Sequence, residues 1–215
     1  MHPVRVSFTL RTPMVIPPGA KHFDALMSWA ATRQAEFDGH PLPWDTQHDI
    51  GIEKHHVGDQ WCFKASAVEI EWIGERDKIH YIKQQRIENH MDAYLSGVLD
   101  KRPAFNAASG PTKAGSYIEP IRWVKTVTAY AVVNDMGRFE SLLPWITHIG
   151  KLHHRDYGAV SSFEVTPDEA AESLWMRRNL PMGSAAGEAH AQAMGALVSP
   201  YWKRENHRPI LAYAG

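Results

Sequence analysis

The stretch IGKLHHRDYGAV, residues 149–160, is the part of the chain from which the fold is most readily interpreted. Gly150 and Gly158 bracket it, and glycine permits positive φ angles and a close approach of the backbone to a ligand. Bare amides in such a turn can face a phosphate, and the side chains between the glycines add donors. A solvated connection between a helix and a strand is the alternative. The candidate contacts are Gly150, Lys151, His153, His154, Arg155, Tyr157 and Gly158, with Tyr157 suited to stacking on a base.

The segments that flank this loop have different periodicities. Residues 138–148 repeat their apolar side chains at helical spacing, and Pro144 is expected to kink or shorten this helix. Residues 159–165 form an apolar strand pattern, and residues 121–133 form the clearest strand pattern of the chain. The loop is therefore expected to lie between a short helix and a strand, where it would be held rigidly.

The N-terminal half extends this pattern. Residues 4–10 alternate apolar and polar side chains as a half-buried strand does, and residues 22–36 are expected to form a helix. Residues 61–73 are strand-like, with one shift of the apolar phase that suggests a bulge or a change of burial. The resulting order is βαββαβ, which predicts an α+β, ferredoxin-like fold, the topology that also underlies the RNA-recognition motif.

The domain organisation is predicted from the length of the chain and from the segment rich in glycine and proline. Residues 1–215 are enough for one large domain or a domain with an insertion, and we expect a single domain. Gly and Pro are frequent in residues 101–120, which predicts the tip of a long hairpin within an insertion over about residues 75–120. Residues 166–215 have no clear pattern and are expected to form an irregular C-terminal extension.

Composition excludes several classes of protein. Hydrophobic residues make up 44% of the chain, which is enough for a sizeable core and argues against global disorder. No apolar run approaches the roughly 20 residues that span a membrane, so no membrane partner is expected. Cys62 is the only cysteine, so no intrachain disulfide forms, which is typical of the reducing cytoplasm.

The charge balance argues against a protein that coats nucleic acid by itself. Lys and Arg number 23 and Asp and Glu 24, whereas such proteins usually carry a strong basic excess. The basic residues are unevenly spread, because residues 101–125 hold five of them and a single acid, Glu119. A local basic strip on a neutral body suits a protein that touches RNA along one edge and other proteins elsewhere.

The thirteen histidines raise the alternative of an enzyme. A histidine can act as general base or acid in RNA cleavage, and His22 at the start of the first helix is the first suspect. The pairs His55-His56 and His153-His154 are further candidates. No tight His-x₃-His or Cys-x₂-Cys spacing occurs, so neither a metal site nor a cofactor is expected.

Five short motifs in order resemble a known family. In chain order, these are HFDAL from His22, FKASA from Phe63, the glycine loop, RNLP from Arg178 and PYW from Pro200. Together, over residues 6 to 204, they resemble the RAMP superfamily of CRISPR-associated proteins and, within it, the third Csf protein of type IV systems.

This resemblance implies a non-catalytic subunit that binds and caps the 5′ handle of the guide crRNA and contacts the backbone filament subunit. It places the glycine loop at the phosphates and makes the insertion a thumb-like hairpin, with Phe105 and Lys113 as candidates that contact nucleotides. Arg178 becomes a further RNA-binding candidate, and target DNA a further partner. The alternative functions are a metal-independent crRNA-processing endoribonuclease that uses a histidine, and a structural adaptor that meets only protein.

Overall fold

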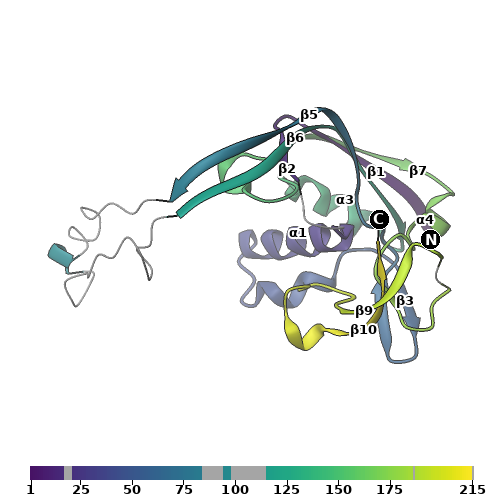
Figure 1. The fold of residues 1–215 in the computed structure, drawn as a ribbon. Coiled ribbons are helices and arrows are strands. Elements are labelled where there is room, and N and C mark those ends of the chain that lie inside the picture. Colours follow the sequence, from purple (N-terminus) through teal and green to yellow (C-terminus); the bar gives the residue numbers. More distant parts are fainter. Residues whose placement is uncertain (17–20, 84–93, 98–114, 186, 215) are drawn as a thin grey trace. The chain divides into compact units, whose positions relative to one another are not determined.

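The structure is a computed structural model that describes residues 1–16, 21–83, 94–97, 115–185 and 187–214. The chain divides into two compact units, the first made of Met1–Gly74 and Arg122–Gly215 and the second of Glu75–Ile121. Within the described residues, antiparallel strands are combined with a few helices, as expected for an α+β protein (Figure 1). None of the described helices is both long and apolar enough to cross a bilayer.

The main sheet is built around β1 (His2–Leu10), the strand expected at the N-terminus. β1 pairs antiparallel with β6 (Gly115–Val133) on one side and with β7 (Val160–Pro167) on the other. β2 (Met14–Val15) and β5 (Glu69–Lys83) both pair with β6. β6 therefore pairs with three of the other four strands of this sheet.

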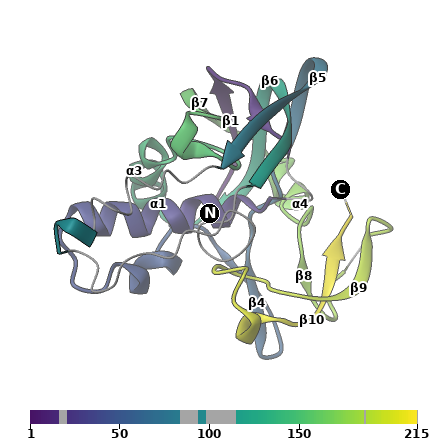
Figure 2. The ribbon, with the colours of Figure 1, turned by 60° about the vertical axis from the view of Figure 1, so that its left-hand side comes forward.

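The core lies between one face of this sheet and two helices, α1 (Phe23–Phe37) and α3 (Met136–Leu142). The ring of Phe23 lies 6.1 Å from that of Phe8 on β1 and 6.1 Å from that of Phe139 on α3, measured between centroids. Both contacts are edge-to-face, a favoured arrangement of aromatic rings. Helices and sheet are thus joined through buried aromatic side chains, and Figure 2 shows both helices on the same side of the sheet.

The shifted apolar phase in residues 61–73 marks the end of one strand and the start of another, not a bulge. β4 (Gln60–Phe63) pairs with β3 (Lys54–Val57) in a separate hairpin, and β5 begins only at Glu69. The chain between β4 and β5 lies in the interior, where Ala65 and Ala67 are both buried. The chain between α1 and β4 contains β3 and the 3-10 helix η1 (Pro43–His48).

Pro144 shortens the helix before the glycine loop, as its sequence predicts. The α-helical part ends at Leu142, and the 3-10 helix η2 (Leu143–Trp145) continues it with the proline in its first turn. The side chain of Asp135 caps α3 by accepting a hydrogen bond from the Arg138 amide at 2.9 Å. The chain consequently leaves the helix early and enters the loop in an extended conformation.

The C-terminal segment is more regular than its sequence suggests. After the short helix α4 (Ala171–Leu174), the strands β8 (Leu180–Pro181), β9 (His190–Gly195) and β10 (Arg208–Tyr213) form a sheet in the order β8-β10-β9. A second buried cluster supports it and consists of Cys62, Val132, Trp175, Leu180, Leu197 and Ile210. The prediction of an irregular extension missed these strands because they are short and pair with distant partners.

The second unit contains the C-terminal part of β5 and the N-terminal part of β6. A hydrogen bond of 2.5 Å links the ring of His80 to the hydroxyl of Ser116. Phe105 and Lys113, the candidates in the hairpin tip, lie outside the described residues.

Candidate nucleic-acid interface

The glycine loop is closed at its base by backbone hydrogen bonds. The amide of Ile149 donates to the carbonyl of Gly158 at 2.8 Å, and the amide of Val160 donates to the carbonyl of Thr147 at 2.9 Å. The loop therefore leaves and re-enters the fold at a fixed neck between η2 and β7.

Gly158 makes this neck possible. Its φ is +69°, and a Cβ at this position would lie 1.9 Å from the carbonyl oxygen of Ile149. Its amide donates to the carbonyl of Pro13 at 2.9 Å, and the residue is buried. Gly158, taken from its sequence as a phosphate-facing residue, has its amide occupied within the fold and acts here by shaping the loop. Gly150, with a φ of +104°, is exposed.

Two residues without the freedom of glycine also have positive φ, Leu152 at 58° and Asp156 at 65°. They flank the 3-10 helix η3 (His153–Arg155). Such a conformation costs roughly 1–3 kcal/mol and persists only where the surroundings enforce it. Here the hydroxyl of Thr12 donates to the carbonyl of Asp156 at 2.5 Å. Backbone strain of this kind clusters at functional sites, which marks the loop as a candidate site.

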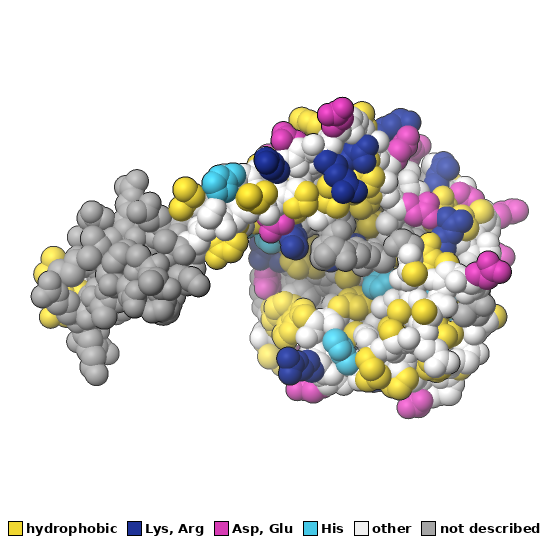
Figure 3. Space-filling model, in the orientation of Figure 1, with side chains coloured by type: hydrophobic (Ala, Val, Ile, Leu, Met, Phe, Trp, Pro, Cys, Tyr) yellow, Lys and Arg dark blue, Asp and Glu magenta, His cyan; other side chains and the backbone are white. Residues whose placement is uncertain are grey.

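The side chains predicted to contact RNA come together at the tip of the loop. Lys151, His153, His154 and Arg155 are exposed, and Tyr157 is half-buried. The rings of His153 and His154 lie 5.9 Å apart between centroids. On the face drawn in Figure 3, Lys and Arg side chains are concentrated in the upper part.

Asp156, the acid of the loop, binds two side chains that sequence reasoning missed as partners. Its Oδ1 lies 3.2 Å from a guanidinium nitrogen of Arg11 and 3.2 Å from Nε2 of His148. The hydrogen bond with His148 and the charge of Arg11 lower the pKa of the Asp156 carboxyl below its ordinary value. The only feature of the sequence that pointed to these contacts was an acidic residue within a basic loop.

A pocket of about 530 Å³ lies beside these groups. Its lining has a polar part and an apolar part, and both belong to the first unit. The lining residues are Arg11, Leu143, Pro144, Ile146, Thr147, His148, Val160, Ser161, Ser162 and Phe163.

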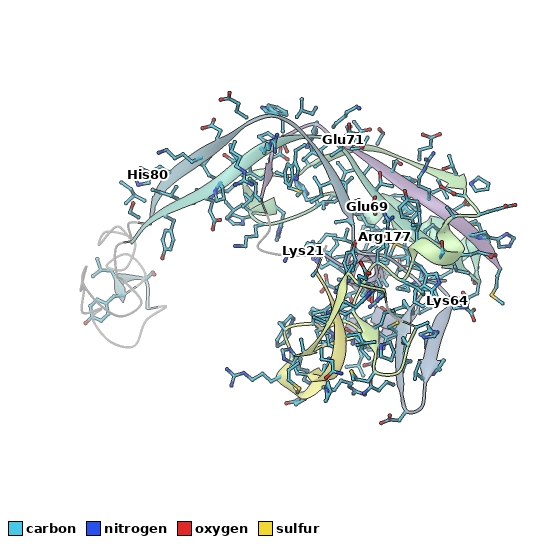
Figure 4. All side chains as sticks on the ribbon, turned by 45° about the vertical axis from the view of Figure 1, so that its right-hand side comes forward. Lys21, Lys64, Glu69, Glu71, His80 and Arg177 are labelled. Atoms are coloured by element: carbon cyan, nitrogen blue, oxygen red, sulfur yellow. The ribbon has the colours of Figure 1, made fainter. Side chains whose placement is uncertain are left out.

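Arg178 corrects the expectation that it contacts RNA, because its side chain is 0% exposed. Its guanidinium donates to the carbonyl of Phe63 at 2.8 Å and to that of Ala65 at 3.2 Å, and it forms an ion pair of 3.2 Å with Asp24. The adjacent Arg177 differs, because it lies at the surface and pairs with Glu69 of β5 (Figure 4). Arg178 is therefore an internal group that holds segments together.

Four of the five sequence motifs meet at Arg178. Asp24 comes from α1, and Tyr201 comes from the C-terminal segment. The two carbonyls belong to Phe63, the last residue of β4, and to Ala65, two residues further on. The hydroxyl of Tyr201 donates to a carboxyl oxygen of Asp24 at 2.8 Å. Burial raises the pKa of Asp24 above its ordinary value, and Arg178 and Tyr201 oppose that rise. These motifs therefore specify a buried network.

His22, the first suspect for catalysis, lies against this network. It is 8% exposed, and its ring stacks on Tyr201 with 5.0 Å between centroids. Burial, Arg178 and Lys21 hold its pKa well below the ordinary value, so the ring is neutral at neutral pH. Its Nδ1 is buried without a hydrogen-bond partner. In the pair His55-His56, Nε2 of His55 lies 3.3 Å from the hydroxyl oxygen of Ser184.

The described residues contain no group of three or more His, Cys, Asp or Glu side chains arranged to hold a metal ion. Cys62 is buried, and burial raises the pKa of its thiol to about 11. A thiol in this environment is a poor nucleophile.

Comparison with curated proteins finds no match for the chain. Comparison with models of protein families finds a match over residues 2–212, to the family described as CRISPR type IV associated protein Csf3. The match spans the main sheet, the glycine loop and the C-terminal sheet. The chain therefore belongs to the Csf3 family of CRISPR type IV associated proteins.

Proposed function

We propose that this chain is a non-catalytic RNA-binding subunit of a type IV CRISPR ribonucleoprotein. It binds and caps the 5′ handle of the guide crRNA and contacts the backbone filament subunits. The observation that carries the proposal is the glycine loop, where four exposed basic or imidazole side chains lie between residues that are held at positive φ. Such a loop would contact mainly the phosphate backbone, which positions RNA without reading its sequence.

The order of the elements supports a RAMP-like domain with a ferredoxin-like fold. The strand path β7-β1-β6-β5, with α1 after β1 and α3 after β6, is the order of a split βαβ arrangement. The glycine loop follows the second helix and precedes the last strand of this arrangement.

The remaining surface suits contacts with other CRISPR components. Trp44 is 62% exposed and Trp202 is 80% exposed, and both line a pocket of about 490 Å³ between η1 and the C-terminal segment. Aromatic side chains are enriched at protein interfaces. A net charge of −1 also fits a subunit that binds RNA over a limited area.

The test removes two charges from the loop within the assembled complex. In complexes purified from a host that expresses all subunits and the guide array, Lys151→Ala with Arg155→Ala is expected to reduce guide RNA retention at high salt. If both residues contact phosphates, the slope of log affinity against log salt falls by about 2. The control is Arg33→Ala with Arg5→Ala, which removes the same charge from exposed positions on α1 and β1. Equal retention of guide RNA in both double variants would show that the loop does not hold the RNA.

The runner-up is a metal-independent endoribonuclease, favoured by the neutral ring of His22 and its unpartnered Nδ1. We expect no specific cleavage when the protein is incubated with repeat RNA and a chelator, since His22 is enclosed by a structural network. Gel analysis of labelled RNA measures this. Specific cleavage products that disappear in His22→Gln would show that the chain is an endoribonuclease, contrary to the proposal. Absence of UV crosslinks to guide RNA in the complex would instead favour the structural adaptor.

A further inference from the structure

Asp156 is the one acid in residues 149–160, and its carboxylate lies where two side chains converge. The Arg11 guanidinium and the His148 imidazole both approach the same oxygen, Oδ1, at 3.2 Å. They come from different parts of the chain, one after β1 and the other before the loop. Two donors directed at one oxygen form a small anion site that is filled by a side chain of the protein.

We propose that Asp156 occupies the position of an RNA phosphate in the free protein. A phosphate of single-stranded RNA then displaces this carboxylate and binds Arg11 and His148, with its nucleotide in the adjacent pocket. This inference rests on the proposed RNA-binding function and adds to it a defined nucleotide site and the residue that must leave it.

The backbone that carries the two donors is held by hydrogen bonds within the fold, so it stays in place when the Asp156 side chain moves. The Arg11 amide donates to the carbonyl of Ala159 at 2.9 Å, and the Ala159 amide donates to the hydroxyl of Thr12 at 2.9 Å. His148 forms an antiparallel bridge with Ala159. The segment after β1 and the neck of the loop therefore hold the anion site as one unit.

Asp156 is held weakly enough to be replaced. Its side chain is 56% exposed and that of Arg11 is 62% exposed, and ion pairs at the surface contribute little to stability. A phosphate offers more acceptor oxygens than a carboxylate, so it can bind Arg11 and His148 through different oxygens instead of sharing one.

The adjacent pocket has the chemistry that one nucleotide needs. Besides Arg11 and His148, hydroxyl groups line its polar part and can donate to a phosphate or a ribose. Phe163, 39% exposed, contributes an aromatic ring to the apolar part, where a base can stack. The volume of about 530 Å³ lies within the range of small-molecule sites. A nucleotide therefore fits the site better than a bare anion.

The decisive variant is Asp156→Asn in the full chain. Its affinity for single-stranded repeat RNA, measured by fluorescence anisotropy, is expected to rise about threefold to tenfold, because the competing carboxylate is gone. Glu164→Gln on β7 is the matched control, with the same charge change on an exposed strand. Arg11→Ala should reduce affinity about tenfold, also in the Asp156→Asn background. Affinity that is unchanged or lower in Asp156→Asn, or equally raised in Glu164→Gln, overturns the proposal.

A second measurement separates this inference from the proposed function. Uridine 5′-monophosphate is expected to shift the NMR resonances of the His148 ring and the Phe163 ring, whereas inorganic phosphate shifts only those of His148. Equal responses to both probes, or a response to neither, overturn the nucleotide site. RNA binding that depends on Lys151 and Arg155 but not on Arg11 leaves the proposed function standing and refutes this inference alone.

Discussion

Replacing Arg178 with methionine is expected to lower the free energy of unfolding by about 3–5 kcal/mol, the typical cost of breaking a buried ion pair on one side. The variant leaves the Asp24 carboxyl buried without its cation, since both side chains are 0% exposed. The carbonyls of Phe63 and Ala65 also lose the hydrogen bonds that they accept from the guanidinium. Urea denaturation followed by tryptophan fluorescence measures the loss.

Arg177→Met is the matched control, because it removes an arginine at the neighbouring position. Arg177 is 44% exposed and pairs with Glu69 at the surface, so its loss is expected to cost at most about 1 kcal/mol. The double variant Arg178→Met with Asp24→Leu should recover part of the stability, since no unpaired charge is left buried. Comparable losses in the two single variants, without recovery in the double one, would contradict the role given to Arg178.

The second large effect is expected for Gly158→Ala. A Cβ would lie 1.9 Å from the carbonyl oxygen of Ile149, so the neck of the loop must open and lose its hydrogen bonds. We expect a loss of more than about 2 kcal/mol of stability, beyond the left-handed strain of roughly 1–2 kcal/mol. Guide RNA retention should fall at least as far as in Lys151→Ala with Arg155→Ala. Chemical denaturation and RNA quantification in the purified complex measure the two effects.

Gly39→Ala isolates the strain from the steric clash. Gly39 has a similar φ of +73°, but a Cβ there would meet nothing within 4 Å. It is expected to show only the strain and to retain guide RNA normally. If Gly158→Ala is no more destabilising than Gly39→Ala and retains RNA, the close approach at the neck is not required.

The sequence predicted the elements whose signal is local. The strand over residues 121–133 and the helix over residues 22–36 have long apolar patterns that need no partner to be seen. The C-terminal sheet escaped prediction because β8 has two residues and its partner β10 lies far along the chain. Pairing of this kind depends on tertiary context, which a window of sequence does not contain.

The same distinction explains the candidate site. The tip of the glycine loop was predicted because its glycines and basic side chains are contiguous in the sequence. Arg11 was missed because it meets Asp156 across 145 positions of sequence. Arg178 was singled out by its motif, but a motif does not reveal whether an arginine faces solvent or carbonyl oxygens. Its burial became clear only with the packing of α1 and β4 around it.

The network around Arg178 also sets an order of events during synthesis of the chain. Asp24 and the segment around Ala65 leave the ribosome early, but the carbonyl of Leu197 and the hydroxyl of Tyr201 complete the shell of the guanidinium only after Tyr201 has been made. Until Arg178 and Tyr201 have emerged, Asp24 lacks first its cation and then its hydroxyl donor. Consolidation of the first helix against the sheet is therefore expected to wait for these two residues, after the glycine loop has already emerged.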